Sequence, residues 1–185
     1  MDLDPTASLW PLRFISAPAS PVEACAIAFC SDSSNKKCKL AQELGADYII
    51  DTSKEDFTEM VLKYTNGYGA KLYLEATGMP DKVIGDIEKT IWWGKQLNST
   101  VILLAIVETP IPINGPTYQM RRANIVGSLG NAGHGTVPRV INLMASGFDI
   151  TKIITKTISL DMVPEKLVDL RTNMDECKVT ITAFE

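Results

Sequence analysis

Short apolar and β-branched runs alternate with longer segments of helical period from about residue 26 to the end of the chain. The runs before residue 130 are Ala26–Ser31, Asp47–Asp51, Lys71–Thr77, Thr100–Val107 and Asn124–Leu129. Several of them are continuously apolar, which is typical of strands that helices cover on both faces. The alternation therefore predicts an α/β fold built on a parallel sheet flanked by helices.

The first two segments between these runs carry signals for the start and the end of a helix. Ser33 or Ser34 can cap the first helix, and Gly45 can take the left-handed conformation that ends it. Thr52 and Glu55 have the spacing of a capping box at the start of the second helix. We therefore expect a helix on either side of the second strand.

The third helix is predicted to begin at Pro80, whose fixed φ suits a first turn, and to end at Gly94. Trp92 and Trp93 are expected to pack near its end. The stretch Glu108–Gln119 contains three prolines and is predicted to be an extended loop. After residue 150 the pattern predicts a strand, an amphipathic helix and a final strand.

Composition limits the classes of function that the chain can have. Its 185 residues, 45% hydrophobic and 22% charged, suffice for one sizeable core. The formal net charge of −4 and the absence of a run of like charges argue against nucleic acid as a partner. The N-terminus lacks the basic start and apolar stretch of a secretory signal, and no apolar run approaches ~18 residues. We therefore expect a cytoplasmic protein that binds neither nucleic acid nor membranes.

The four cysteines, Cys25, Cys30, Cys38 and Cys177, form no C-x-x-C pair. The sequence therefore encodes neither a zinc knuckle nor a dithiol redox motif. Because cysteine favours protein interiors, we expect these residues to be buried, reduced thiols.

Asp32 directly follows the first run. In dinucleotide-binding folds an acidic residue at this place accepts hydrogen bonds from the adenosine ribose and repels the extra phosphate of NADP. Aspartate is also an ordinary loop residue, so the position alone leaves both interpretations open. The G-x-G-x-x-G motif that should precede it by about 20 residues is absent, because the chain has no glycine before Gly45.

The prediction is therefore a Rossmann-like parallel sheet flanked by helices, with its first strand and its Gly-rich loop missing or replaced. In the strand order 3-2-1-4-5-6 that first strand is central and joins the two halves of the sheet. Two sheet edges would stay unpaired unless Leu12–Ser16 fills the slot, and unpaired edges favour self-association.

Several ordered motifs resemble the carboxyl-terminal half of zinc-containing medium-chain alcohol and polyol dehydrogenases, near the sorbitol and threonine dehydrogenase branch. The motifs are KLAQELGADYIIDTSKEDF, YTNGYGAKLYLEATGMP and the long segment that begins MRRANIVGSLGNAGHGTVPRV. The resemblance covers about residues 31–185. Within this family, the sequence of the chain is most similar in character to enzymes that act on inositol-like polyols or their ketones.

The resemblance, which is to an NAD(P)-dependent family, implies NAD as the coenzyme and a set of residues that bind it. Asp32 matches the ribose-binding acid, Lys37 a basic residue near the adenosine, and Lys178 a basic side chain that reaches the pyrophosphate. Ala76, Thr77 and Gly78 match a strand end that passes beside the coenzyme, and Ala105 and Ile106 match the strand end that faces the nicotinamide. The backbone that holds the carboxamide matches Gly127, Ser128 and Leu129.

The stretch Gly127–Pro138, GSLGNAGHGTVP, holds four glycines and the only histidine of the chain, His134. It resembles a P-loop only superficially, because His134 stands at the position of the lysine. One histidine cannot supply the three protein ligands of a catalytic zinc. The stretch can be a turn that lies beside the nicotinamide or a turn with no ligand role, and both interpretations stay open. The helix that follows is predicted to begin at Thr136 and to bury Val137, Val140, Ile141 and Met144.

Family members also carry an amino-terminal catalytic domain whose Cys, His and Glu or Cys ligands hold zinc, and no part of this sequence resembles it. The resemblance therefore implies no catalytic residues and no metal ligands in this chain. It implies three parts: an atypical segment, 1–25; a Rossmann-like coenzyme domain, 26–160; and a helix and strand, 161–185, that pack on the catalytic domain in the family.

The expected function is the coenzyme-binding portion of a dehydrogenase that transfers a hydride from a small alcohol or polyol, inactive by itself and homo-oligomeric. The alternatives are a non-catalytic nucleotide-binding module and a module that keeps the sheet only to oligomerise.

Overall fold

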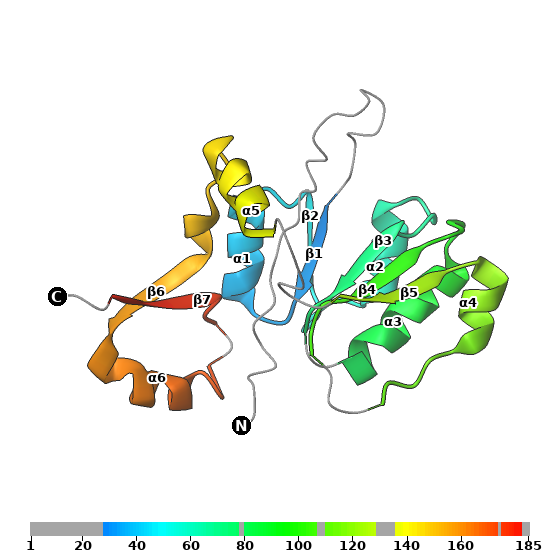
Figure 1. Ribbon diagram of the computed structural model, residues 1–185. Helices are drawn as coiled ribbons and strands as arrows, with labels where there is room; N and C mark the ends of the chain where they lie inside the picture. The colour runs from blue at the N-terminus through cyan, green and yellow to red at the C-terminus, as the bar shows by residue number, and fades with distance from the viewer. Residues whose placement is uncertain (1–27, 78–79, 107–109, 129–135, 174, 183–185) are drawn as a thin grey trace.

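The computed structural model describes residues 28–77, 80–106, 110–128, 136–173 and 175–182. Parallel strands alternate with helices, as the sequence predicts (Figure 1). The strands are β1 Phe29–Asp32, β2 Tyr48–Asp51, β3 Leu72–Glu75, β4 Thr100–Leu103, β5 Asn124–Gly127, β6 Ile154–Ser159 and β7 Lys178–Thr182. The helices are α1 Asn35–Glu43, α2 Phe57–Tyr64, α3 Pro80–Trp93, α4 Gly115–Arg121, α5 Thr136–Ala145 and α6 Val163–Asp169, with short 3-10 turns at Ile150–Ile153 and Leu160–Met162.

Among the described residues the strands form three parallel sheets: β1-β2, β3-β4-β5 and β6-β7. Neither the outer edge of β1 nor that of β3 pairs with another described strand. This interruption lies where the order 3-2-1-4-5-6 places its central strand. The expected loss of the first strand is thus consistent with the described ladders, while Leu12–Ser16 lies outside the described residues.

Helices cover both faces of the β1-β2 sheet. On one face Cys30 packs with Ala41 of α1. On the other face Ile50 packs with Met60 and Val61 of α2. Three aromatic rings close this second face: the rings of Phe29 and Tyr48 stack, with centroids 5.2 Å apart, and those of Tyr48 and Tyr64 stack at 4.3 Å.

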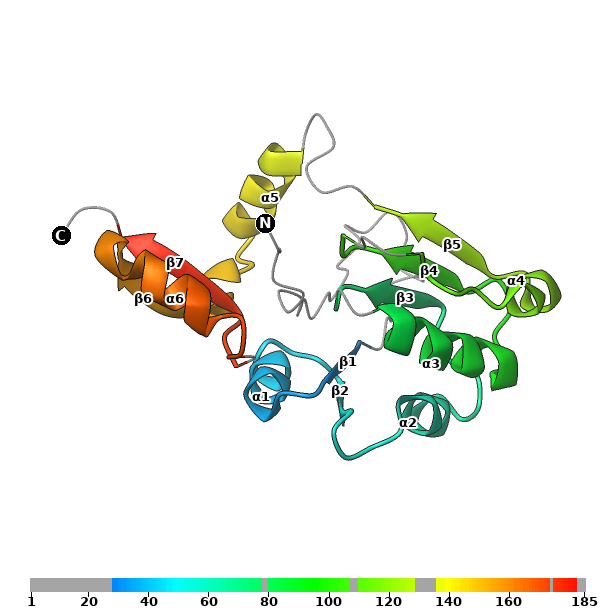
Figure 2. The same ribbon diagram turned by 90° about the horizontal axis from the view of Figure 1, so that it is seen from below.

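The main core lies between α3 and the β3-β4-β5 sheet. Ile84, Ile87 and Ile91 recur at helical spacing on α3 and pack against Tyr73 of β3 and Val101 of β4. Figure 2 shows α3 along one face of this sheet. Trp92 and Trp93 are not packed as predicted: the buried stripe ends at Ile91, so the next two positions point outward and are 42% and 71% exposed.

Local signals placed most helix ends correctly. Ser34 caps α1 by accepting the backbone N–H of Lys37. The prediction of a capping box at Thr52 is wrong. The chain turns at Asp51, and α2 begins later, at Phe57, after the N-cap Asp56, whose side chain accepts the Glu59 N–H.

Two further expectations need correction. The Pro-rich stretch is not a loop throughout, because Pro116 suits the first turn of α4. The predicted buried face of α5 is exposed, since α5 stands apart from both sheets that precede it in the chain (Figure 2). Its exposed members are Val137, Val140, Ile141 and Met144. Within the described ranges, none of the helices has the length and apolar character needed to cross a lipid bilayer.

Candidate functional site

The carboxyl ends of β3, β4 and β5 are in register at one edge of their sheet. Glu75 pairs with Leu103, and Leu103 pairs with Gly127. The ladder continues one step beyond the strands: Leu104 N donates to Glu75 O at 2.7 Å, and Ser128 N donates to Leu103 O at 2.9 Å. Because ligands of parallel α/β sheets bind beyond this edge, the segments that follow the three strands share one candidate surface.

The structure thus brings together the predicted residues that follow these strands. Ala76 and Thr77 come directly after β3, and Ala105 and Ile106 follow β4. Ser128 follows β5. Ile106 is 73% exposed, so its side chain is available to a ligand. The predicted Gly78 and Leu129 lie outside the described residues, and so does His134.

Glu75 is a residue of this edge that sequence reasoning missed. Its side chain is fully buried, and Oε1 accepts both the N–H and the hydroxyl of Thr77 at 2.7 Å. Within the described part of the chain, Oε2 is buried without a hydrogen-bond partner. A charged residue within the otherwise apolar strand LYLE is the signal that could have found it. Glu75 fixes the turn that carries Thr77 at the candidate surface.

Asp32 ends β1, and its Oδ1 accepts the backbone N–H of Ser34 at 2.7 Å. Burial raises the pKa of its carboxyl above the ordinary value, and this outweighs the lowering by the Ser34 amide and by the positive charge of Lys37. Because the carboxyl lies at a strand end beside the first turn of α1, it is placed to accept hydrogen bonds from a bound polar group.

Lys178 comes to this same corner from the far end of the sequence. Cys177 packs against the cluster of Cys30 and Ala41. Burial raises the pKa of its thiol, while the charges of Lys37 and Lys178 oppose the rise. Asp32, Lys37 and Lys178 therefore all act electrostatically on Cys177, and that they share one ligand stays a prediction. Lys37 itself is buried.

The described cysteines are free thiols, with Cys30 and Cys38 buried and Cys177 half-buried. Burial raises the pKa of Cys30 to about 12, with further contributions from Asp32 and the two other thiols. A thiol with so high a pKa is not a thiolate near neutral pH and is a poor nucleophile. The expectation of buried, reduced thiols is confirmed for Cys30 and Cys38, and Cys25 lies outside the described residues.

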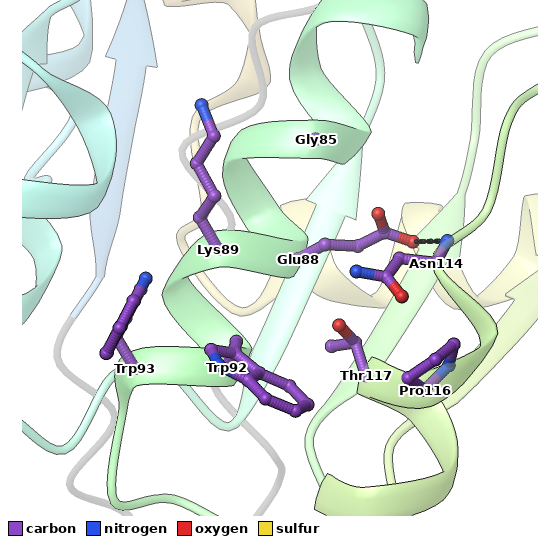
Figure 3. Close-up of a pocket in the computed structure, with 8 residues that line it drawn as sticks. All are labelled: Gly85, Glu88, Lys89, Trp92, Trp93, Asn114, Pro116 and Thr117. Carbon is purple, nitrogen blue, oxygen red and sulfur yellow. Dashed lines mark hydrogen bonds between the residues drawn. The ribbon is translucent and has the colours of Figure 1, made fainter.

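A cavity of about 320 Å³ lies elsewhere, between α3 and α4 (Figure 3). Glu88 and Thr117 face each other across it, and Glu88 Oε1 accepts the Asn114 N–H at 2.9 Å. Trp92 forms one wall. None of the described residues that are predicted to bind a coenzyme lines this cavity. Across the described positions, no three or more His, Cys, Asp or Glu side chains are grouped so that they could hold a metal ion.

Comparisons with known proteins agree with these observations. Residues 24–146 match the model of a family described as zinc-binding dehydrogenase. A relative named scyllo-inosose 3-dehydrogenase, from Thermotoga maritima, is 53% identical over 151 residues. The match covers 82% of this chain and 38% of that protein. The chain thus spans about two fifths of the length of this relative.

Solved structures reproduce the arrangement of the elements. One, described as an alcohol dehydrogenase from Thermotoga maritima, superposes with a TM-score of 0.78 and 52% identity over 84% of this chain and 39% of its own. Another, an alcohol dehydrogenase from E. coli in complex with NADH, gives a TM-score of 0.68 at 20% identity over 82% of this chain and 43% of its own. The second likeness concerns the fold alone.

Proposed function

Because the chain belongs to the zinc-binding dehydrogenase family, we propose that it is the coenzyme-binding portion of an NAD(P)-dependent alcohol or polyol dehydrogenase. The reaction would be hydride transfer from a secondary alcohol. The observation that carries the proposal is that the ends of β3, β4 and β5 are in register at one edge of the sheet. The residues expected at the nicotinamide half come directly after these strand ends. The fold class and the family resemblance predicted from the sequence are confirmed.

The chemistry of the donor set fits the adenosine half of NAD. Asp32 offers carboxylate oxygens at a strand end, and hydroxyls of a ribose are donors that match them. Lys37 and Lys178 supply positive charge in the same corner, where the negative pyrophosphate would lie. No glycine precedes Gly45 to form the usual phosphate loop, so these two lysines would supply much of the attraction for the phosphates. An acid at Asp32 favours NAD over NADP.

The nicotinamide half would lie beyond β3, β4 and β5. When bound, the coenzyme supplies the acceptor of the hydride, and the protein supplies its orientation. Thr77, held by Glu75, and the backbone of Gly127 and Ser128 would fix the ring and its carboxamide. Ala76, Gly78, Ala105, Ile106 and Leu129 complete the proposed contact surface.

We propose the division of the chain that the family suggests: residues 1–25 atypical, 26–160 binding coenzyme and 161–185 packing on a catalytic domain. The described residues do not fit a catalytic zinc, since no suitable group of ligands is present among them. No catalytic step is therefore assigned to this chain. A small alcohol or polyol as substrate, a cytoplasmic location and a homo-oligomeric state belong to the same proposal.

The first prediction concerns binding without turnover. We expect calorimetric titration of the 185-residue chain with NADH to give a Kd in the micromolar range, because Asp32 and the strand ends are in place. We expect no alcohol-dependent reduction of NAD by zinc-replete protein, because the proposed division assigns the polarising metal to the catalytic domain. Absence of NADH binding would favour an oligomerisation module, and turnover with a polyol would contradict the proposed inactivity.

The second prediction concerns self-association. Among the described strands, β1 and β3 each keep an unpaired edge, and such edges pair with other chains. We expect light scattering coupled to size exclusion to show an oligomer at micromolar concentration. A monomeric peak would count against it.

A further inference from the structure

Ser34, at the start of α1, lies between two carboxylates from opposite ends of the sequence. Its N–H donates to Asp32 Oδ1 at 2.7 Å, and its hydroxyl donates to Asp175 Oδ1 at 3.0 Å. Asp175 Oδ2 in turn forms an ion pair with Lys36 Nζ at 2.9 Å. One serine therefore links Asp32, the acid proposed to bind ribose, to an aspartate that neither the sequence motifs nor the family match assigns to the site.

Asp175 is negatively charged in this position. Its hydrogen bonds with Lys36 and with the Ser34 hydroxyl lower the pKa of its carboxyl, and the charge of Lys37 acts in the same direction. A carboxylate is also favourable beside the first turn of a helix, where unpaired N–H groups carry partial positive charge. Asp175 thus occupies the donors that would otherwise attract another anion to this corner.

We propose that Asp175 is a specificity-determining residue that, together with Asp32, makes the site select an unphosphorylated ribose over a 2′-phosphorylated one. The inference rests on the proposed function and deepens it. A phosphate monoester carries about −1.5 to −2 charges at neutral pH, so two carboxylates beside Ser34 repel it. Asp175 also removes Lys36 and the Ser34 hydroxyl, the side chains best suited to bind that phosphate, by holding both.

A purely structural role for Asp175 predicts a different result. The same contacts tie the segment before β7 to α1, and the side chain of Lys36 is 74% exposed. If tethering were the whole role, loss of the carboxylate would weaken NADH and NADPH binding alike. A role in specificity changes the ratio of the two dissociation constants.

The test measures Kd for NADH and for NADPH by calorimetry on the full chain and its variants. In Asp175→Asn, we expect the ratio of the NADPH Kd to the NADH Kd to fall about tenfold, because one repelling charge is lost and two donors are released. Adding Lys36→Gln to Asp175→Asn should restore much of the original ratio, since the released ammonium is then absent.

Glu176→Gln is the matched control. It removes the same charge from the neighbouring residue, whose carboxylate is bound instead by Thr155 Oγ1 at 2.7 Å and by Lys166 Nζ at 3.3 Å. The ratio should stay within about twofold of the original, because the loss of this carboxylate releases neither Lys36 nor the Ser34 hydroxyl, which Asp175 still holds.

The outcomes separate the two proposals. If the parent chain binds NADH and Asp175→Asn leaves the ratio unchanged, or changes it no more than Glu176→Gln does, the role of Asp175 is wrong and the proposed function stands. If neither the parent chain nor any variant binds either coenzyme, both are wrong. A selective gain in NADPH affinity that depends on Lys36 supports the inference.

Discussion

Replacing Gly94 by alanine is expected to lower the free energy of unfolding by about 3 kcal/mol. A Cβ at this position would lie 2.5 Å from the carbonyl oxygen of Tyr68 and 2.8 Å from that of Thr90. Both neighbours are backbone atoms and cannot rotate away. Two hydrogen bonds join the segment after α2 to the segment after α3 at this place: Lys95 N donates to Gly67 O at 2.9 Å, and Gln96 N donates to Tyr68 O at 2.8 Å. Any shift that relieves the clash must disturb these bonds.

Gly85 provides the control for this prediction. It lies inside α3, and a Cβ added there would meet nothing within 4 Å. Gly85→Ala should therefore stabilise the protein by up to about 1 kcal/mol, through the higher helix propensity of alanine. Urea denaturation followed by circular dichroism measures both. Equal stability of the two variants would mean that the backbone at Gly94 and the backbone at Tyr68 are farther apart than the structure shows.

Replacing Glu75 by alanine is expected to cost about 3 kcal/mol. The change leaves the N–H and hydroxyl of Thr77 without their shared acceptor and opens a cavity in a fully buried position. Glu75→Gln keeps an acceptor oxygen and the volume, so we expect it to cost about 1 kcal/mol or less. Denaturant unfolding gives the two costs, and amide hydrogen exchange reports on the Thr77 N–H.

The Thr77 amide should lose protection in the alanine variant and keep it in the glutamine variant. NADH affinity should follow the same order if Thr77 lies at the coenzyme. Similar stability and similar exchange in the two variants would contradict the role of Glu75 in holding this turn.

Features with local causes could be predicted from the sequence. Gly45 ends α1 with φ of +95°, a conformation that glycine adopts without strain, and Ser34 caps the same helix. Pro80 begins α3 as its fixed φ suggests. These positions depend on a few neighbouring residues, so a single sequence contains the information.

Features that depend on packing between distant segments were missed. The period of α5 indicates an apolar face but not that this face stays exposed in the described structure. In the candidate site, the register of β3, β4 and β5 puts Thr77 and Ser128 just beyond one edge of the sheet, and their role in binding stays a prediction. The hydrogen bond between Ser34 and Asp175 spans 141 positions, and no spacing rule connects such residues. The role of Glu75 needed the knowledge that its strand is covered by α3.

Phe57 and Ala70 pack against both the core around Ile50 and the core around Ile91. No ladder of backbone hydrogen bonds joins β1-β2 to β3-β4-β5 among the described residues. The cooperativity of unfolding between these halves therefore depends on these side chains and on the hydrogen bonds that join α2 and the loop after it to α3 and the loop after that helix. Weakening these links together is expected to split a single melting transition into two.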